Sequence, residues 1–355
     1  MRRPIRLMIV DDSMVARAVL SRMVESDGGF EIAAVAGTAE DAIEALGQVR
    51  VDVILLDLEM PGAGGLKSIP RILAAARGAQ VLIVSSLAEE GAEETVAALA
   101  LGAADTLPKP GTGRFNGRFS EVLLAKLRAI GPAGVSARYA PADERALART
   151  VSVRTPPMAT GPLGLVAIGA STGGIHALGS LFEALPARIG VPILVTQHLP
   201  APFMTVFARQ LSTASGRPAM VAEDGMRLSP DQIVIAPGDA HLNLDQVGDR
   251  LIVRLSNQKM VSGCLPSVDP MLATAGAVLG KGALGIVLTG MGRDGTEGAI
   301  KLLAAGGSII AQDEHSSAVW GMPRSVVEAG LACDVLPPAK IARRIALRVE
   351  EGVCR

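Results

Sequence analysis

Short apolar runs alternate along the first third of the chain with segments whose apolar residues recur at helical spacing. Segments 15–24 and 39–46 have the helical period. Runs of strand length bounded by turn residues, with helical segments between them, are typical of a doubly wound parallel sheet. The expected strands are Leu7–Val10, Glu31–Val35, Val51–Leu56 and Val81–Val84, with a weaker one at Asp105–Leu107.

The same alternation resumes after residue 163 and predicts a second, mostly parallel α/β sheet. Strands are expected at 165–168, 192–196, 284–289 and 308–311, and helices at 175–185, 203–211, 269–279 and 295–305. In the middle, the runs Gln232–Ala236, His241–Leu244 and Arg250–Leu255 are short and separated by turn residues. We expect them to be partly antiparallel strands joined by turns, so that the mostly parallel sheet carries an inserted β-hairpin.

Residues 131–162 separate these two patterns and are rich in Pro, Ala, Gly, Ser and Thr, with no sustained apolar period. Such a composition is typical of a semi-flexible linker. We therefore expect a first domain over residues 1–128, a linker over 129–162 and a second domain over 163–350. One or two helical turns are expected at Ala142–Arg149.

Composition excludes several functional classes. Hydrophobic residues make up 49% of the 355, enough for two cores, but aromatic residues make up only 2%, too few for stacking nucleic-acid bases. The net charge of −1 argues against binding to DNA. The three cysteines are far apart and indicate reduced thiols rather than a disulfide or structural zinc framework. Without a secretory apolar core or a membrane-spanning run, we expect a cytoplasmic protein that does not insert into membranes.

Five polar residues follow the expected strands of the first domain, where ligands of parallel sheets collect. Asp11 and Asp12 end the first strand, and Asp57 ends the third. Clustered carboxylates repel one another unless a cation is present, and their oxygens suit Mg²⁺. Ser85 and Lys109 follow the fourth and fifth strands, where a hydroxyl and an ammonium group could hold an acyl phosphate on Asp57. The alternative is that these residues are helix caps and surface charges.

The segments Val10–Ser13, Leu55–Gly62 and Lys109–Pro110 resemble the receiver domain of two-component response regulators. The resemblance implies a flavodoxin-like fold and phosphorylation of Asp57 by a histidine kinase. It also implies that Mg²⁺ is held by Asp12, Asp57 and the Glu59 carbonyl, helped by Asp11. Two positions depart from the family: Gly64-Gly65 replaces the usual Asp-Gly, and Thr106 stands where an aromatic switch residue is common.

In the second domain, the run Leu165–Ile168 leads directly into Gly169-Ala-Ser171-Thr-Gly173, and a helical segment follows. A strand-to-helix turn of the form Gly-x-Ser-x-Gly can expose a serine nucleophile. The same glycines could instead cradle a phosphate, or form an ordinary tight turn.

His198 and Asp294 follow two other strands of this domain and complete a candidate triad with Ser171. A serine needs a base to take its proton, and a carboxylate orients that base. The chain order Ser, His, Asp differs from that of α/β-hydrolases. The glycines before Asp294 suit an oxyanion hole, with Met291 as a candidate backbone donor. His198 could also be structural and Asp294 a turn residue, and three other histidines compete for the role of base: His176, His241 and His315.

Motifs through the second domain resemble the chemotaxis receptor methylesterases of the CheB family. These are Ile168–Gly174, Thr196–Pro200, Ile235–Asp239, Pro266–Asp269, Leu288–Gly295, Gln312–Glu314 and Gly321–Arg324. The resemblance implies that Ser171 is the nucleophile, His198 the base and Asp294 its orienting group. It further implies that Thr172 is a neighbouring polar group and that the Met291 amide is an oxyanion donor.

The family hydrolyses glutamate methyl esters on chemoreceptors, and many members deamidate glutamines there. The resemblance therefore predicts a phosphorylation-activated esterase with chemoreceptors as substrates and no cofactor for the ester chemistry. The alternative is a non-catalytic adaptor that binds a receptor or kinase. A nucleotide-binding regulator is disfavoured because the P-loop lysine is missing. Ser262-Gly-Cys-Leu265 replaces the usual Asn-Arg-His-Arg, which removes positive charge from the expected rim of the site.

Overall fold

The computed structural model describes residues 3–353, except 63, 86–88, 110–116 and 132–154. The chain divides into two compact units, Met1–Ala140 and Pro141–Arg355. The helix expected at Ala142–Arg149 lies outside the described residues. The domain limits 1–128, 129–162 and 163–350 therefore stay a prediction.

The first unit is a five-stranded parallel sheet in the order β2-β1-β3-β4-β5, as the alternating pattern predicted. Two helices begin at hydroxyl caps: Ser13 Oγ accepts from Ala16 N–H, and Thr38 Oγ1 accepts from Asp41 N–H. The strands are β1 Ile5–Val10, β2 Phe30–Ala36, β3 Val53–Leu56, β4 Gln80–Ser85 and β5 Asp105–Pro108. The helices are α1 Met14–Glu25, α2 Ala39–Gln48, α3 Gly65–Ala75, α4 Glu89–Ala100 and α5 Gly117–Ile130.

The second unit is built on a seven-stranded parallel sheet in the order β14-β13-β12-β6-β7-β9-β8. Its strands are β6 Leu165–Ala170, β7 Ile193–Gln197, β8 Ala219–Val221, β9 Ile233–Ile235, β12 Ala283–Val287, β13 Ser308–Gln312 and β14 Asp334–Leu336. The α-helices are α7 Gly174–Ala184, α8 Ala201–Ser215, α9 Val268–Leu279, α10 Thr296–Ala304, α11 Met322–Glu328 and α12 Pro338–Val353, and a short 3₁₀ turn, η3, spans Gly280–Gly282.

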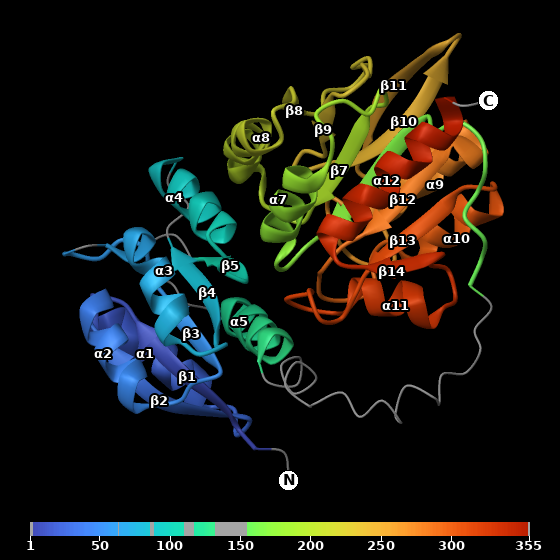
Figure 1. Ribbon diagram of the computed structural model, residues 1–355. Helices are drawn as coiled ribbons and strands as arrows, with labels where there is room; N and C mark the ends of the chain where they lie inside the picture. The colour runs from blue at the N-terminus through green and yellow to red at the C-terminus, as the bar shows by residue number, and fades with distance from the viewer. Residues whose placement is uncertain (1–2, 63, 86–88, 110–116, 132–154, 354–355) are drawn as a thin grey trace. The chain divides into compact units, whose positions relative to one another are not determined.

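Helices cover both faces of this second sheet (Figure 1). Helix α7 packs against α8 and α12 on one face, whereas α9 packs against α10 on the other. The central strands are buried along their whole length, which explains why they are continuous apolar runs rather than alternating ones. Their side chains join those of α9 in one apolar core, including Leu165, Leu194, Met271 and Leu272.

The expected inserted hairpin is present, and two of the three short runs form it. β10 His241–Val247 and β11 Arg250–Ser256 pair in antiparallel fashion as a separate two-stranded sheet. β9, within the expected run Gln232–Ala236, instead pairs in parallel with β7 and β8. The run is fully buried in the main sheet, and burial on both faces favours the parallel position.

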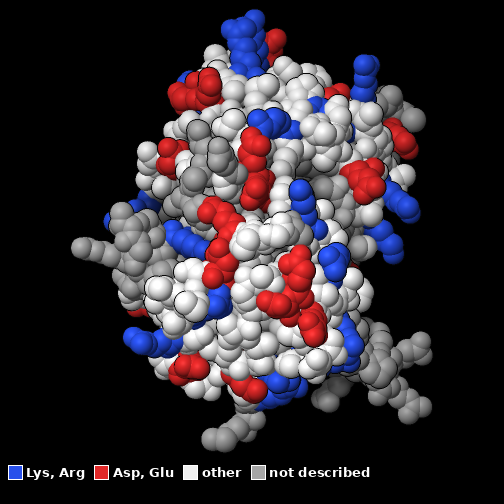
Figure 2. Space-filling view, turned by 90° about the vertical axis from the view of Figure 1, so that its left-hand side faces the viewer, with Lys and Arg blue, Asp and Glu red and all other residues white. Residues whose placement is uncertain are grey.

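Charge is mixed on the surface. Acidic and basic side chains are interspersed on the face drawn in Figure 2. None of the helices within the described ranges is long and apolar enough to cross a membrane.

Candidate functional site

Three neighbouring strands of the second sheet bring Ser171, His198 and Asp294 to one edge. Ser171 follows β6 directly, His198 follows β7, and Asp294 lies in the loop between β12 and α10. Ala170 and Gln197 are register partners, so Ser171 and His198 are the next residues along adjacent strands. The strands that follow β6 in the chain, beginning with β7, lie on one side of it, and β12 and the later strands lie on the other. Such a reversal of strand order is where open α/β sheets bind their ligands.

The turn at Ser171 is the strand-to-helix elbow that the sequence predicted. Ser171 N–H donates to Thr289 O at 3.0 Å, and Gly174 N–H donates back to Ser171 O at 2.8 Å. Gly173 has a φ of +78°, a left-handed conformation in which a side chain would be strained and would also overlap Ala318. The elbow leaves Ser171 half-buried at the start of α7.

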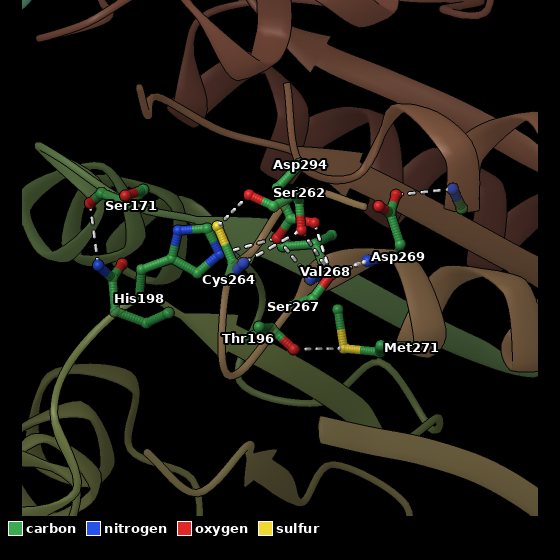
Figure 3. A network of polar contacts seen from close by, with 12 residues as sticks. Ser171, Thr196, His198, Ser262, Cys264, Ser267, Val268, Asp269, Met271 and Asp294 are labelled. Carbon is green, nitrogen blue, oxygen red and sulfur yellow. Dashed lines mark hydrogen bonds and ion pairs between the residues drawn. The ribbon is translucent and has the colours of Figure 1, made fainter. Parts of the chain in front are cut away.

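His198 is paired with Asp294. His198 Nε2 lies 2.8 Å from Asp294 Oδ2, and the side chains are 17% and 1% exposed respectively. A neutral imidazole that donates from Nε2 to the carboxylate leaves Nδ1 as its proton acceptor. Figure 3 shows the ring between Ser171 on one side and Asp294 on the other. The described hydrogen bonds do not include one from Ser171 Oγ to His198; in free enzymes this contact is often long and tightens around substrate.

Asp294 is held by two further donors. Ser267 Oγ donates to Oδ1 at 2.6 Å, and Val268 N–H donates to Oδ2 at 2.7 Å. Burial alone would raise the pKa of Asp294, but the hydrogen bond and charge of His198, together with these donors, hold that pKa below its usual range. Asp294 therefore stays ionised beside the imidazole. Ser267 caps α9 and Val268 begins it, and both reach Asp294 only in the folded chain. In the sequence they are marked only as part of the motif Pro266–Asp269.

Asp269 is a second buried carboxylate close to Asp294. Burial is the largest cause that raises its pKa, to about 6, and the neighbouring Asp294 adds to it. Its Oδ1 accepts from Gly298 N–H at 2.8 Å, which ties the start of α9 to α10. Asp269 and Asp294 are therefore neighbouring acidic groups with different pKa values, and Asp294 is the one that stays ionised at lower pH.

The loop after β12 provides candidate oxyanion donors. A Cβ on Gly290 would lie 2.7 Å from Ser171 Cβ, so this loop passes directly beside the serine. Gly290 N–H is already bonded to Val319 O, whereas none of the hydrogen bonds in the described part of the chain uses the Met291 amide. The Met291 amide is thus able to donate to a substrate oxygen. Thr172 is buried, and its carbonyl accepts from Thr289 Oγ1 at 2.9 Å.

The other histidines do not pair with Asp294. His241 is buried, and both ring nitrogens are engaged: Nδ1 accepts from Ser267 N–H at 2.9 Å, and Nε2 lies 2.7 Å from Gln258 O. His176 and His315 are exposed on the surface.

Cys264 belongs to the segment expected at the rim of the site, but its contact with His198 and Asp294 is a finding that the sequence did not predict. Its Sγ and the ligand atoms of His198 and Asp294 all lie within 4.8 Å of one another. Burial, with Asp294 as the next cause, raises the pKa of the Cys264 thiol to about 11. The thiol is therefore protonated at neutral pH and is not a nucleophile there.

In the first unit, the residues expected to bind phosphate lie together at the strand ends. Lys109 Nζ lies 2.7 Å from Asp57 Oδ2 and 2.9 Å from Asp11 Oδ2. Burial raises the pKa of Asp57, an effect that the hydrogen bond from Lys109 partly offsets. Burial would lower the pKa of Lys109, but its bonds to Asp57 and Asp11 raise it, so it stays charged. Ser85 Oγ lies 2.8 Å from Thr95 Oγ1, a partner that the sequence did not suggest.

The carboxylates of this unit have the chemistry of a magnesium site. Oxygens of Asp11, Asp12 and Asp57 lie within 4.8 Å of one another. Asp11 and Asp57 are buried and Asp12 is exposed, which leaves an open side. Three hard oxygen donors with room for waters are what Mg²⁺ prefers, so the residues present fit this ion.

Comparisons with known proteins agree with this arrangement. Residues 166–345 match the family model described as CheB methylesterase, and residues 7–114 match that of the response regulator receiver domain. A protein-glutamate methylesterase/protein-glutamine glutaminase 1 of Paramagnetospirillum magneticum is 39% identical over 95% of this chain and 94% of its own length. A similarly named protein of Caulobacter vibrioides is 41% identical over 97% and 98% respectively. The crystal structure of the Thermotoga maritima CheB methylesterase catalytic domain is 37% identical, with a TM-score of 0.51, and covers 52% of this chain and 98% of its own.

Proposed function

The chain belongs to the CheB methylesterase family and carries a receiver domain, and on that premise we propose that Ser171, His198 and Asp294 are its catalytic triad. The observation that supports this most directly is the pairing of His198 with the buried Asp294, at the strand end next to that of Ser171. The chain is a phosphorylation-regulated esterase that removes methyl groups from glutamate γ-methyl esters of chemoreceptors and deamidates receptor glutamines. The comparisons give no support to the non-catalytic adaptor. We place the reaction in the cytoplasm.

The acylation step uses the nitrogen of His198 that Asp294 leaves free. His198 Nδ1 takes the proton of the Ser171 hydroxyl as Oγ attacks the ester carbonyl carbon. Asp294 stabilises the imidazolium, and the Met291 amide stabilises the oxyanion of the tetrahedral intermediate. Collapse of the intermediate breaks the bond to the methoxy group, which leaves as methanol with the proton from His198.

The second half of the reaction reverses these roles. A water molecule gives a proton to His198 Nδ1 and attacks the acyl-enzyme carbonyl. The Ser171–acyl bond breaks, Ser171 recovers its proton, and a glutamate carboxylate is released. A glutamine side chain would follow the same path, with ammonia in place of methanol.

In the receiver, we assign phosphorylation to Asp57. An oxygen of Asp57 would take the phosphoryl group from a histidine kinase, and Lys109 is already placed to share the charge of the product. Ser85 would exchange its bond to Thr95 for one to a phosphoryl oxygen.

Mg²⁺ would be held by Asp11, Asp12, Asp57 and the Glu59 carbonyl. It would supply positive charge for the phosphoryl oxygens during transfer. The ammonium group of Lys109, which contacts Asp11 and Asp57, adds a second positive charge beside these carboxylates.

The test is methanol release from methylated receptor membranes by Ser171→Ala and His198→Gln, with His176→Gln as the matched control. His176 is exposed and close to Ser171 in sequence, so it controls for a histidine change near the elbow. We expect both triad variants to lose several orders of magnitude in rate and the control to stay close to wild type. A rate within tenfold of wild type for Ser171→Ala would place the nucleophile elsewhere.

A further inference from the structure

Three different donor atoms meet beside the elbow: the Cys264 thiol, the His198 imidazole and the Asp294 carboxylate (Figure 3). They come from the segment before α9, the end of β7 and the loop after β12. Their ligand atoms lie within 4.8 Å of one another. Small movements of the side chains would bring all three onto one ion, because tetrahedral zinc ligands lie about 2.0–2.3 Å from the metal.

The donor set selects a class of metal. Sulfur, imidazole nitrogen and one carboxylate oxygen are the ligands of Zn²⁺ and related transition metals, whereas Mg²⁺ requires oxygen. Three protein ligands leave a fourth position open for water, as in zinc sites with an exchangeable ligand. Among the described residues there are thus two distinct donor sets: three carboxylates in the first unit and this mixed set in the second.

We propose that Cys264, His198 and Asp294 form a binding site for Zn²⁺ or a similar divalent transition metal, and that the bound ion reversibly inhibits the esterase. The proposal rests on the triad assigned above for its effect on activity, but not for metal binding itself. Cys264 lies in the segment Ser262–Leu265, where the sequence departs from the pattern that the resemblance implies.

The surroundings of the site favour a dication. Asp294 and Asp269 both act to raise the pKa of the Cys264 thiol after burial, so the local field is negative. A bound metal reverses this effect, because a coordinating thiol is deprotonated by the ion. Ser267 and Val268 already hold Asp294 in place, and hydrogen-bonded ligands of this kind strengthen metal sites.

The way to the site is open on the side of Cys264. The residues before it, Val261 to Gly263, are exposed, and Cys264 itself is partly exposed. His198 is 17% exposed. An ion can therefore arrive from solvent over this segment without rearrangement of the sheet.

Metal binding would stop catalysis because it moves the proton of the His198 ring from Nε2 to Nδ1. His198 Nε2 now faces Asp294, and a metal bound there displaces the proton from Nε2. The neutral ring then carries its proton on Nδ1, the nitrogen that must accept the proton of Ser171. The thiol proton of Cys264 passes to solvent. The ion also neutralises the negative charge of Asp294, which would otherwise stabilise the imidazolium of His198.

The first experiment measures ester hydrolysis by the full-length enzyme in Mg²⁺ with increasing buffered Zn²⁺. Each rate is expressed relative to that of the same variant without Zn²⁺. We expect inhibition, and we expect that EDTA followed by fresh Mg²⁺ reverses it. In Cys264→Ser the Zn²⁺ concentration for half inhibition should rise by about 10- to 100-fold or more, because loss of a residue that only supports a ligand already weakens metal binding by that factor. Cys333→Ser is the matched control, since Cys333 is the other described free cysteine. Equal Zn²⁺ sensitivity in wild type and Cys264→Ser would overturn the proposal.

The second experiment does not depend on activity. Co²⁺ added to the full-length Ser171→Ala variant should give a thiolate-to-cobalt charge-transfer absorption that the additional Cys264→Ser change removes. Zn²⁺ should also protect Cys264 of the wild-type chain from alkylation, which peptide mass analysis locates without any variant. Absence of both the absorption and the protection would refute the site. A cobalt absorption in Ser171→Ala, together with a wild-type chain that shows no ester hydrolysis in the absence of Zn²⁺, would support the metal site and contradict the proposed triad.

Discussion

Gly169→Ala tests whether the position of Asp294 depends on the backbone of the neighbouring strand. A Cβ at residue 169 would lie 2.6 Å from Val268 Cγ2, far inside van der Waals contact. Val268 is fully buried and cannot turn away freely. Because Val268 N–H donates to Asp294 at 2.7 Å, a displaced Val268 also displaces the carboxylate that orients His198.

The expected cost follows from the packing. Overpacking a well-filled core costs about 1–3 kcal/mol, and we expect Gly169→Ala to lower the free energy of unfolding by that amount. Val268→Ala removes both methyl groups that clash. The loss of unfolding free energy in the double variant should therefore be smaller than the sum of the losses in the two single variants by about 1–2 kcal/mol. This difference is within the range of coupling between contacting residues. The added Cβ at residue 169 would still lie 3.1 Å from the Cβ of residue 268, which is a tight contact. Val268→Ala should therefore restore only part of the lost stability.

Urea unfolding of wild type, Gly169→Ala, Val268→Ala and the double variant measures the effect on stability. Methanol release by the same samples measures the effect on activity. Gly179→Ala is the matched control, because a Cβ there meets nothing within 4 Å and α7 gains the better helix former. We expect this control to be neutral or stabilising and fully active. Strict additivity in the cycle, or wild-type activity of Gly169→Ala, would refute the link from Gly169 through Val268 to Asp294.

Three further results are expected. Asp294→Asn should reduce the rate of ester hydrolysis by about 10,000-fold with little change in circular dichroism, and a loss below tenfold would contradict its role as the orienting group. Asp269→Asn should raise the free energy of unfolding by up to about 3 kcal/mol above pH 6, because the raised pKa of about 6 means that the ionised group costs stability there. That gain should fade below about pH 4, where wild-type Asp269 is protonated, and urea midpoints that shift equally at pH 4 and pH 8 would contradict it. In the full-length chain, Asp57→Asn should abolish stimulation of methanol release by acetyl phosphate, and stimulation that persists would move the phosphoacceptor to another residue.

The proximity of the three candidate catalytic residues was predictable because each of them follows an apolar strand. Ser171, His198 and Asp294 are separated in sequence, but parallel strands end at one edge, and a residue placed after each strand arrives there. The same argument brought Asp57 and Lys109 together in the first unit. Strands of ordinary length with clear bounding turns made this possible.

The groups that the sequence did not reveal act from positions with no periodic signal. Ser267 and Val268 reach Asp294 through the first turn of α9, and Cys264 reaches the same place from an irregular segment. Strands β8 and β14 have only three residues each, too few for periodicity to mark them. Helix α12 was also missed, although Ile341, Ala342 and Ile345 give it a buried face at helical spacing.

The order in which the strands occur has a consequence during synthesis of the chain. β6 and β7 emerge from the ribosome early in the second unit, but Asp294 follows only after β12 has been made. A chain that terminates before residue 294 therefore lacks the carboxylate that pairs with His198, even where β12, the strand next to β6, is complete. With the triad proposed above, premature termination yields inactive fragments rather than a free esterase. Because the receiver is translated first, every ribosome that completes the triad has already produced the domain that regulates it.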